Sequence, residues 1–145
     1  MYKPKWAQMH SSMSTAMNMS QPSLFRTIPE KDYLHVFNEG IVDGQKVVDL
    51  LNYRKADVST ATNVPVSSIR YEPQKMPLEL KERLTEWATA LNLVYGFFKD
   101  KDKTILWFSI PNPLLGDMAP RDMIRVGRFK KLLNFIQTAI EENQR

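Results

Sequence analysis

The sequence predicts an all-α protein, on the evidence of two long apolar stripes at helical spacing and of helix-capping residues at several boundaries. Between Leu80 and Phe98 the apolar residues recur at spacings of three and four, and a second stripe runs from Phe129 to Ile140. No segment shows the alternation of apolar and polar residues that a half-buried strand requires. The chain of 145 residues is long enough to bury a core without disulfides, and it contains no cysteine.

The N-terminal half is expected to hold a polar tail and four helices. Residues 1 to 26 contain five of the eight methionines among Ser, Thr, Asn and Gln, which indicates either plain disorder or a tail ordered by a partner. The capping residues of Thr27 to Glu30 predict a first helix that ends at Gly40. We expect Asp43 to cap a second helix, Arg54 to Thr62 to form a third that ends at Asn63, and Val66 to Tyr71 to form a short fourth.

The C-terminal half is expected to be helical as well. Pro73 and Pro77 break the chain before the long helix, and the alternating charges of Lys99 to Lys103 predict a solvated turn after it. The remaining predicted elements are a short helix at 104–109, a rigid connector at 111–116, a short helix from Pro120 that Gly127 stops, and a closing helix at 128–142. We therefore divide the chain into a tail at 1–26, a helical region at 27–75 and a second helical region at 76–145.

The search for catalytic groups points away from an enzyme. The only histidines, His10 and His35, have no ligand-spaced neighbours, and the five glycines are too scattered for a phosphate-binding loop. Three glutamates at 79, 82 and 86 share a helix face, but Lys81 and Arg83 stand among them, which favours an ordinary solvated face. We expect no catalytic residue, no metal and no cofactor.

Charge and hydropathy exclude further classes. The net charge of +4 is mild, residues 31–75 carry six basic and six acidic side chains, and no polybasic tract is present. The apolar runs are far shorter than the roughly 20 residues of a membrane span, and the N-terminus lacks the apolar stretch of a signal peptide. A cytoplasmic protein without a membrane partner is the expectation.

The segment from Lys55 to Arg70 fits a helix-turn-helix. Such a unit needs a small residue where the helices cross, a residue that tolerates positive φ at the turn, and apolar residues after the turn and within the second helix. Ser59, Asn63, Val64 and Ile69 meet these demands in order, although Thr62 stands where an apolar residue is usual. On this alignment Lys55 would contact phosphate, and the DNA bases would be read by Ser67, Ser68 and Arg70. The alternative is an inert helical pair that packs the N-terminal half.

The C-terminal third carries a spaced set of residues. Between Trp107 and Gly127 the pattern is Trp-x3-Pro-Asn-x2-Leu-Gly-x3-Pro-x2-Met-x3-Gly, followed by an amphipathic final helix. This pattern resembles the toxin-binding domain of the Xre/MbcA/ParS antitoxin family, and with the helix-turn-helix-like segment the resemblance covers about residues 43 to 145. The family usually has a second glycine where Asp117 stands here.

The resemblance implies an Xre-like N-terminal part and a C-terminal toxin-binding domain in an antitoxin of a bacterial type II toxin-antitoxin system. Its partner would be a RES-type toxin that degrades NAD, whose cofactor pocket is plugged by the end of the antitoxin's final helix. Terminal glutamates could engage the cationic groups that hold a diphosphate in such a pocket. Carried over by position, the plug is Glu141, Glu142, Asn143, Gln144 and Arg145, and the flanking face is Arg128, Lys131, Phe135 and Thr138.

The same family implies repression of the protein's own operon, with a homodimer presenting two recognition helices to operator DNA. Two other functions stay open at this point. One is a stand-alone helix-turn-helix transcriptional regulator without a toxin. The other is an assembly module that recruits a partner through Trp6 and the methionine-rich tail.

Overall fold

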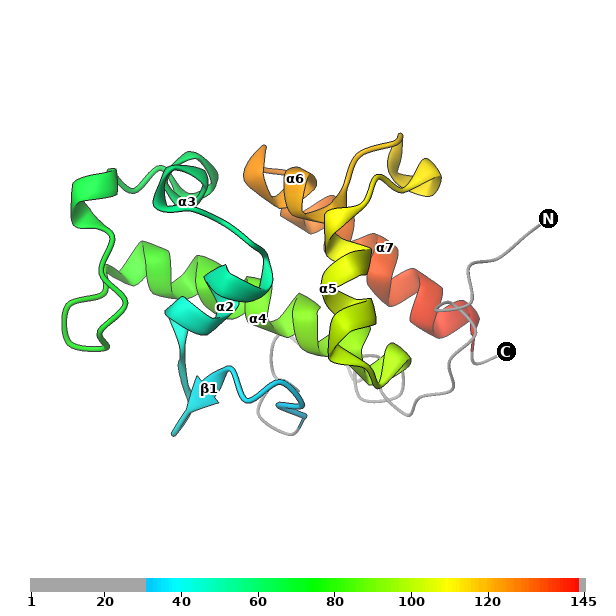
Figure 1. Ribbon diagram of the computed structural model, residues 1–145, viewed down its shortest axis with the longest axis horizontal. Helices are drawn as coiled ribbons and strands as arrows, with labels where there is room; N and C mark the ends of the chain where they lie inside the picture. Colours follow the sequence, from blue (N-terminus) through cyan, green and yellow to red (C-terminus); the bar gives the residue numbers. More distant parts are fainter. Residues whose placement is uncertain (1–30, 144–145) are drawn as a thin grey trace.

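The computed structural model describes residues 31–143, and this part of the chain is mostly helical (Figure 1). The prediction of a helical fold is therefore confirmed, with one small hairpin as the exception. The expectations for residues 1–30, Gln144 and Arg145 lie outside the described residues. In chain order the elements are β1 (Phe37–Asn38), β2 (Ile41–Val42), α2 (Gly44–Leu50), α3 (Lys55–Thr62), the 3-10 turn η3 (Val66–Ser68), α4 (Leu78–Phe98), α5 (Lys101–Ser109), the 3-10 turn η4 (Pro113–Leu115), α6 (Pro120–Arg125) and α7 (Phe129–Glu142).

The predicted first helix is wrong over its described part, where the chain forms the antiparallel hairpin β1–β2. The carboxylate of Asp32 accepts hydrogen bonds from the backbone N–H groups of Val36, at 2.9 Å, and Phe37, at 3.0 Å. These are N–H groups that a helix would direct to backbone carbonyls four residues earlier. His35 and Glu39 also adopt positive φ, of 55° and 49°, which no right-handed helix contains.

A buried amide fixes this segment against the rest of the protein. Asn92, on α4, is 6 % exposed, and its side-chain oxygen accepts the backbone N–H of Leu34 at 3.0 Å. Its side-chain nitrogen donates to the Asp32 carboxylate at 3.1 Å. A buried side-chain amide is stable only when it finds such partners, so α4 decides the course of a segment about 60 residues away in sequence.

α4 is the central element, and the apolar stripe predicted for it is confirmed. Leu80, Leu84, Trp87, Leu91 and Val94 are all buried. Helices α2, α3, α5 and α7 pack against α4, with α2 and α3 toward one end and α5 to α7 toward the other (Figure 1). The predicted boundary between 75 and 76 falls in the loop before α4, and the buried side chains on both sides of it belong to one hydrophobic cluster.

α2 begins where the sequence predicts. Asp43 accepts the backbone N–H of Lys46 at 3.2 Å and so caps the helix. Gly44 follows it at a close approach of elements, because a Cβ built there would lie 2.7 Å from Cδ1 of Tyr71 and 2.8 Å from Cδ1 of Leu84. Only glycine lets α2 come this near to α4 and to the loop after η3.

α3 is confirmed, and the predicted fourth helix is wrong in length. Asn63 ends α3 with φ of 63°, and Val64 and Ile69 are buried as expected. Beyond Pro65, however, only the three residues of η3 are helical, because Ile69 is extended, with φ −77° and ψ 113°, and is fully buried in that conformation. The core position of Ile69 therefore overrides local helix formation.

The predicted turn after α4 is shorter than expected. Lys99 ends α4 with φ of 54°, and Asp100 already caps α5 by accepting the backbone N–H of Lys103 at 2.9 Å. Residues 101–103 are therefore helical. Further on, the expected stops are present, since Gly116 ends η4 with φ of 69° and Gly127 follows α6 with φ of 85°.

Candidate functional site

The last helix lies along the protein body. In α7 one face is buried and the other exposed, and the buried face consists of Leu132, Leu133, Ile136, Ala139 and Ile140. The helix is therefore anchored along its length, and any binding surface on it is its outward flank. A freely projecting α7, as the plug prediction implied, is absent from the described residues.

A groove runs beside this flank, between α7 and η4. Its cavity has a volume of about 560 Å³, and its wall on the α7 side includes all four residues predicted for the flanking face. The structure thus brings together side chains chosen from the sequence and a segment between Leu114 and Met118 that the sequence interpretation treated only as a connector. The lining residues are Leu114, Leu115, Gly116, Met118, Met123, Arg128, Lys131, Asn134, Phe135 and Thr138.

The groove combines an apolar surface with positive charge. Leu114 is 53 % exposed, and Met118 and Phe135 are partly buried beside it. The Nη1 group of Arg128 lies 3.8 Å from Sδ of Met118, which places a cation at the edge of the apolar surface. Lys131 is exposed on the same wall, and the lining set contains no acidic residue. Such a surface is complementary to an apolar side chain next to a carboxylate.

Local sequence holds the η4 side of the groove in place. The side-chain oxygen of Asn112 accepts the backbone N–H of Leu114 at 2.9 Å, and Pro113 starts the 3-10 turn. The backbones of Asn112 and Met118 pair across the loop, with the Asn112 N–H donating to the Met118 carbonyl at 3.1 Å. The loop that presents Leu114 is therefore closed by its own hydrogen bonds.

The predicted plug residues are only partly presented to solvent. Glu141 and Glu142 are exposed, whereas Asn143 is 7 % exposed and its N–H donates to the Ala139 carbonyl at 3.1 Å. Asn143 thus belongs to the packed end of α7 in this structure. Gln144 and Arg145 lie outside the described residues.

The predicted DNA-contacting residues are exposed but do not lie on a recognition helix. Lys55 is at the start of α3, whereas Ser67, Ser68 and Arg70 lie in and after η3, beyond the other end of α3. A three-residue 3-10 turn stands where the second helix of the motif was expected, so the structure brings the two groups to opposite ends of one short helix.

Thr62 is a polar residue at a position where the helix-turn-helix pattern usually has an apolar one, and its hydrogen bonds explain how it is accommodated. Its hydroxyl donates to the Val58 carbonyl at 2.7 Å and accepts the Val64 N–H at 3.2 Å, so a polar side chain is satisfied at a buried position.

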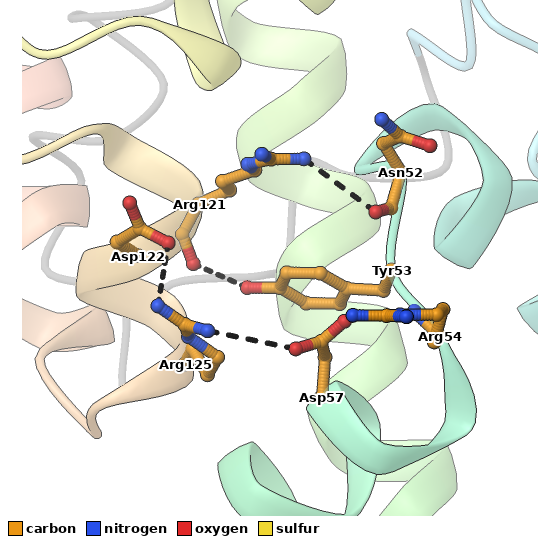
Figure 2. Close-up of a pocket in the computed structure, with 7 residues that line it drawn as sticks. All are labelled: Asn52, Tyr53, Arg54, Asp57, Arg121, Asp122 and Arg125. Carbon is orange, nitrogen blue, oxygen red and sulfur yellow. Dashed lines mark hydrogen bonds and ion pairs between the residues drawn. The ribbon is translucent and has the colours of Figure 1, made fainter.

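A polar cluster that sequence reasoning missed joins α3 to α6 (Figure 2). The Tyr53 hydroxyl donates to the Arg121 carbonyl, and burial raises the pKa of this tyrosine well above its ordinary value. The Arg125 guanidinium lies 2.9 Å from Asp122 and 3.6 Å from Asp57. The spacing of Arg121 and Arg125, four residues apart on one helix face, is the only signal of this cluster in the sequence.

Three further features concern metals, membranes and the glutamates of α4. Among residues 31–143, no three His, Cys, Asp or Glu side chains gather where they could hold a metal ion. Within the same range, none of the helices has both the length and the apolar character to cross a membrane. Of the three glutamates on α4, Glu86 is engaged by Arg83 in a two-point ion pair, with distances of 2.9 and 2.8 Å.

Comparisons of the chain with protein-family models, with curated proteins and with solved structures give no match.

Proposed function

We propose that this protein is a cytoplasmic antitoxin of a type II toxin-antitoxin system, which neutralises its toxin by direct binding and performs no chemistry of its own. The observation that carries the proposal is the groove between η4 and α7. Four residues that the resemblance assigns to the toxin-binding face line this one cavity: Arg128, Lys131, Phe135 and Thr138. The toxin class, a RES-type enzyme that degrades NAD, rests on the residue pattern from Trp107 to Gly127.

The groove has the properties of a protein-docking surface. Its apolar lining includes Leu114, a side chain that is exposed to solvent and does not contribute to the hydrophobic core. Its cationic residues lie at the edge, where they would orient a partner. Because α7 is packed along the body, the partner would meet a rigid helix flank. Rigid surfaces bind with a smaller loss of conformational freedom than mobile tails.

Neutralisation would then be steric. With the toxin docked in the groove, the exposed carboxylates of Glu141 and Glu142 extend the same helix toward the toxin's cofactor pocket. In that pocket the two carboxylates would pair with the cationic groups that otherwise hold the diphosphate of NAD. The toxin would then be unable to bind NAD, the substrate that it degrades, because the pocket is filled.

A growth-rescue assay tests the docking surface. The protein encoded by the neighbouring reading frame is expressed together with the full-length chain, and growth is compared among single variants. We expect Lys131→Glu and Leu114→Asp to abolish rescue, because the first cancels the positive charge of the groove and the second places a charge on its apolar surface. The matched controls are Lys130→Glu and Leu78→Asp, exposed positions that do not line the groove, and both should still rescue growth.

The occlusion step needs a separate test. A deletion of residues 137–145 would remove buried side chains of α7 and destabilise the protein, so charge reversal is the better experiment. Glu141→Lys with Glu142→Lys should preserve binding of the toxin but restore its NAD-degrading activity within the complex. Full inhibition by this double variant would contradict occlusion by the helix end.

A role in operon autoregulation is part of the proposal. Because the 3-10 turn η3 stands where the recognition helix was expected, a homodimer would have to contact operator DNA from the start of α3 and from η3, through Lys55, Ser67, Ser68 and Arg70. The alternative is a stand-alone helix-turn-helix regulator without a toxin. It predicts tight operator binding with a steep salt dependence, and Arg70→Ala should abolish that binding. Gel-shift titrations at several salt concentrations, combined with the rescue assay, separate the two, because a stand-alone regulator rescues nothing.

A further inference from the structure

The polar cluster between α3 and α6 encloses a second cavity, separate from the docking groove. Its volume is about 340 Å³, and seven residues from the α2–α3 connector, α3 and α6 line it (Figure 2). None of them belongs to the groove beside α7. They are Asn52, Tyr53, Arg54, Asp57, Arg121, Asp122 and Arg125.

The acidic side chains of this cavity are already engaged. Asp122 and Asp57 both face Arg125, at 2.9 and 3.6 Å, and Asp57 also accepts the backbone N–H of Arg54 at 2.9 Å. Both carboxylates thus face the same guanidinium, and no ion pair joins either of them to Arg54 or Arg121 within residues 31–143.

Arg54 and Arg121 are those remaining arginines. The Arg54 side chain is exposed and forms no ion pair within residues 31–143. Within the described residues, the Arg121 guanidinium makes its hydrogen bonds through Nη1, at 3.3 Å to the Leu51 carbonyl and 3.5 Å to the Asn52 carbonyl. Arg125 adds a third surplus donor, because its Nε–H is buried with no acceptor in the described part of the chain. The lining residues carry three positive charges against two negative ones, so the cavity has a net positive charge and guanidinium N–H groups that remain available to a ligand.

Such a donor surplus suits an oxyanion. A guanidinium presents its N–H groups in a planar fork that matches two oxygens of a phosphate. The cavity volume lies at the small end of the range for small-molecule sites, about 300 to 1,000 Å³. Its two aspartates would repel the neighbouring phosphates of a long polyanion, and this favours a ligand with a single phosphate group.

We propose that this cavity binds the phosphate group of a small phosphate monoester, with Arg54 and Arg121 as its principal contacts. The ligand would bridge the α2–α3 connector and α6, two segments separated by almost 70 residues that already meet through the Tyr53 hydroxyl and the Arg121 guanidinium. Binding would therefore stabilise the contact between the N-terminal and C-terminal helices. A ligand that binds only the folded state raises the unfolding temperature, and the rise grows with the logarithm of its concentration above Kd.

Calorimetric titration and thermal unfolding of the full chain test the proposal. The probes are inorganic phosphate, adenosine 5′-monophosphate and adenosine, each against sodium chloride at equal ionic strength. Phosphate and the monophosphate should bind and raise the unfolding temperature, whereas adenosine and chloride should not. Arg54→Gln should weaken binding about tenfold or more, because a charge-assisted hydrogen bond is lost. Arg121→Gln should do the same.

Lys75→Gln is the charge-matched control, since Lys75 is an exposed cation that does not line the cavity. Arg54→Gln keeps the test valid if Arg121→Gln fails to fold, because the Arg54 side chain is exposed and holds no other element in place. Equal binding by the Arg54→Gln and Lys75→Gln variants would overturn the proposal. So would a chloride effect as large as that of phosphate, or Arg54-dependent binding of a DNA duplex alone.

Discussion

At the scale of single residues, the loop after η4 carries a measurable strain. Asp117 adopts φ of 65° directly after Gly116. The antitoxin family that the sequence pattern resembles usually has glycine at this position. A left-handed conformation costs an L-residue roughly 1 kcal/mol, less for aspartate than for most, and glycine nothing. We expect Asp117→Gly to raise the free energy of unfolding by about 0.5 kcal/mol in urea titrations. Gly116→Ala, the control at φ of 69°, should lower it by about 1 kcal/mol. A loss of stability in Asp117→Gly would contradict the strain.

Tyr53 gives a residue-scale prediction in alkaline solution. Burial raises the pKa of its hydroxyl above the ordinary value of 10.0, so the folded state holds this proton more tightly than the unfolded state. The stabilisation is fully present below pH 10 and is lost as the pH rises toward the folded-state pKa. Urea unfolding at neutral pH and at several values above 10 should show this loss.

Tyr53→Phe is the test variant. It should lower the free energy of unfolding by about 1 kcal/mol at neutral pH, because the Arg121 carbonyl loses its donor. It should also reduce the alkaline loss, and burial of Tyr71, which raises that pKa as well, accounts for the remainder. An unchanged pH dependence in Tyr53→Phe would show that the hydroxyl is not buried as described.

At the scale of elements, the approach of α2 to α4 depends on the absence of one side chain. A Cβ at Gly44 would lie within 2.8 Å of atoms of both Tyr71 and Leu84. Gly44→Ala should therefore lower the free energy of unfolding by about 1 to 3 kcal/mol, although alanine is the better helix former. Gln45→Ala, at the adjacent exposed position, should stay within about 0.5 kcal/mol of the parent in the same chemical denaturation. A stabilising Gly44→Ala would mean that α2 can move away from α4 without cost.

At the scale of the whole molecule, one core serves both predicted regions. The ring of Trp87, on α4, meets the ring of Tyr53 edge-on at 5.7 Å, and α5 to α7 cover the other end of the same helix. Unfolding should therefore be a single transition, with coincident curves for tryptophan fluorescence and for helical circular dichroism. A fragment of residues 76–145 should not fold alone, because α4 would lose its cover by α2 and α3. Two separate transitions in the full chain would contradict this.

The same scales show how far sequence reasoning reaches. The periodic stripes of α4 and α7, the cap at Asp43 and the stops at Asn63 and Gly127 are local patterns, and the structure bears them out. The hairpin at 37–42 is not predictable in this way, because it depends on Asp32 meeting Asn92 across about 60 residues. The flanking residues of the groove were predicted from a resemblance, whereas its opposite wall at Leu114 and Met118 became apparent only in three dimensions.

What the sequence by itself determined is the helical class, most helix boundaries and the amphipathic character of the last helix, because these follow from side-chain spacing and backbone preference within a few residues. The tertiary structure decided which flank of α7 remains open, that Asn143 is packed in the subunit, and that Arg54, Arg121 and Arg125 surround one cavity. These features arise from contacts between distant segments. Local periodicity carries no information about which distant segments meet, since packing of the whole core selects them.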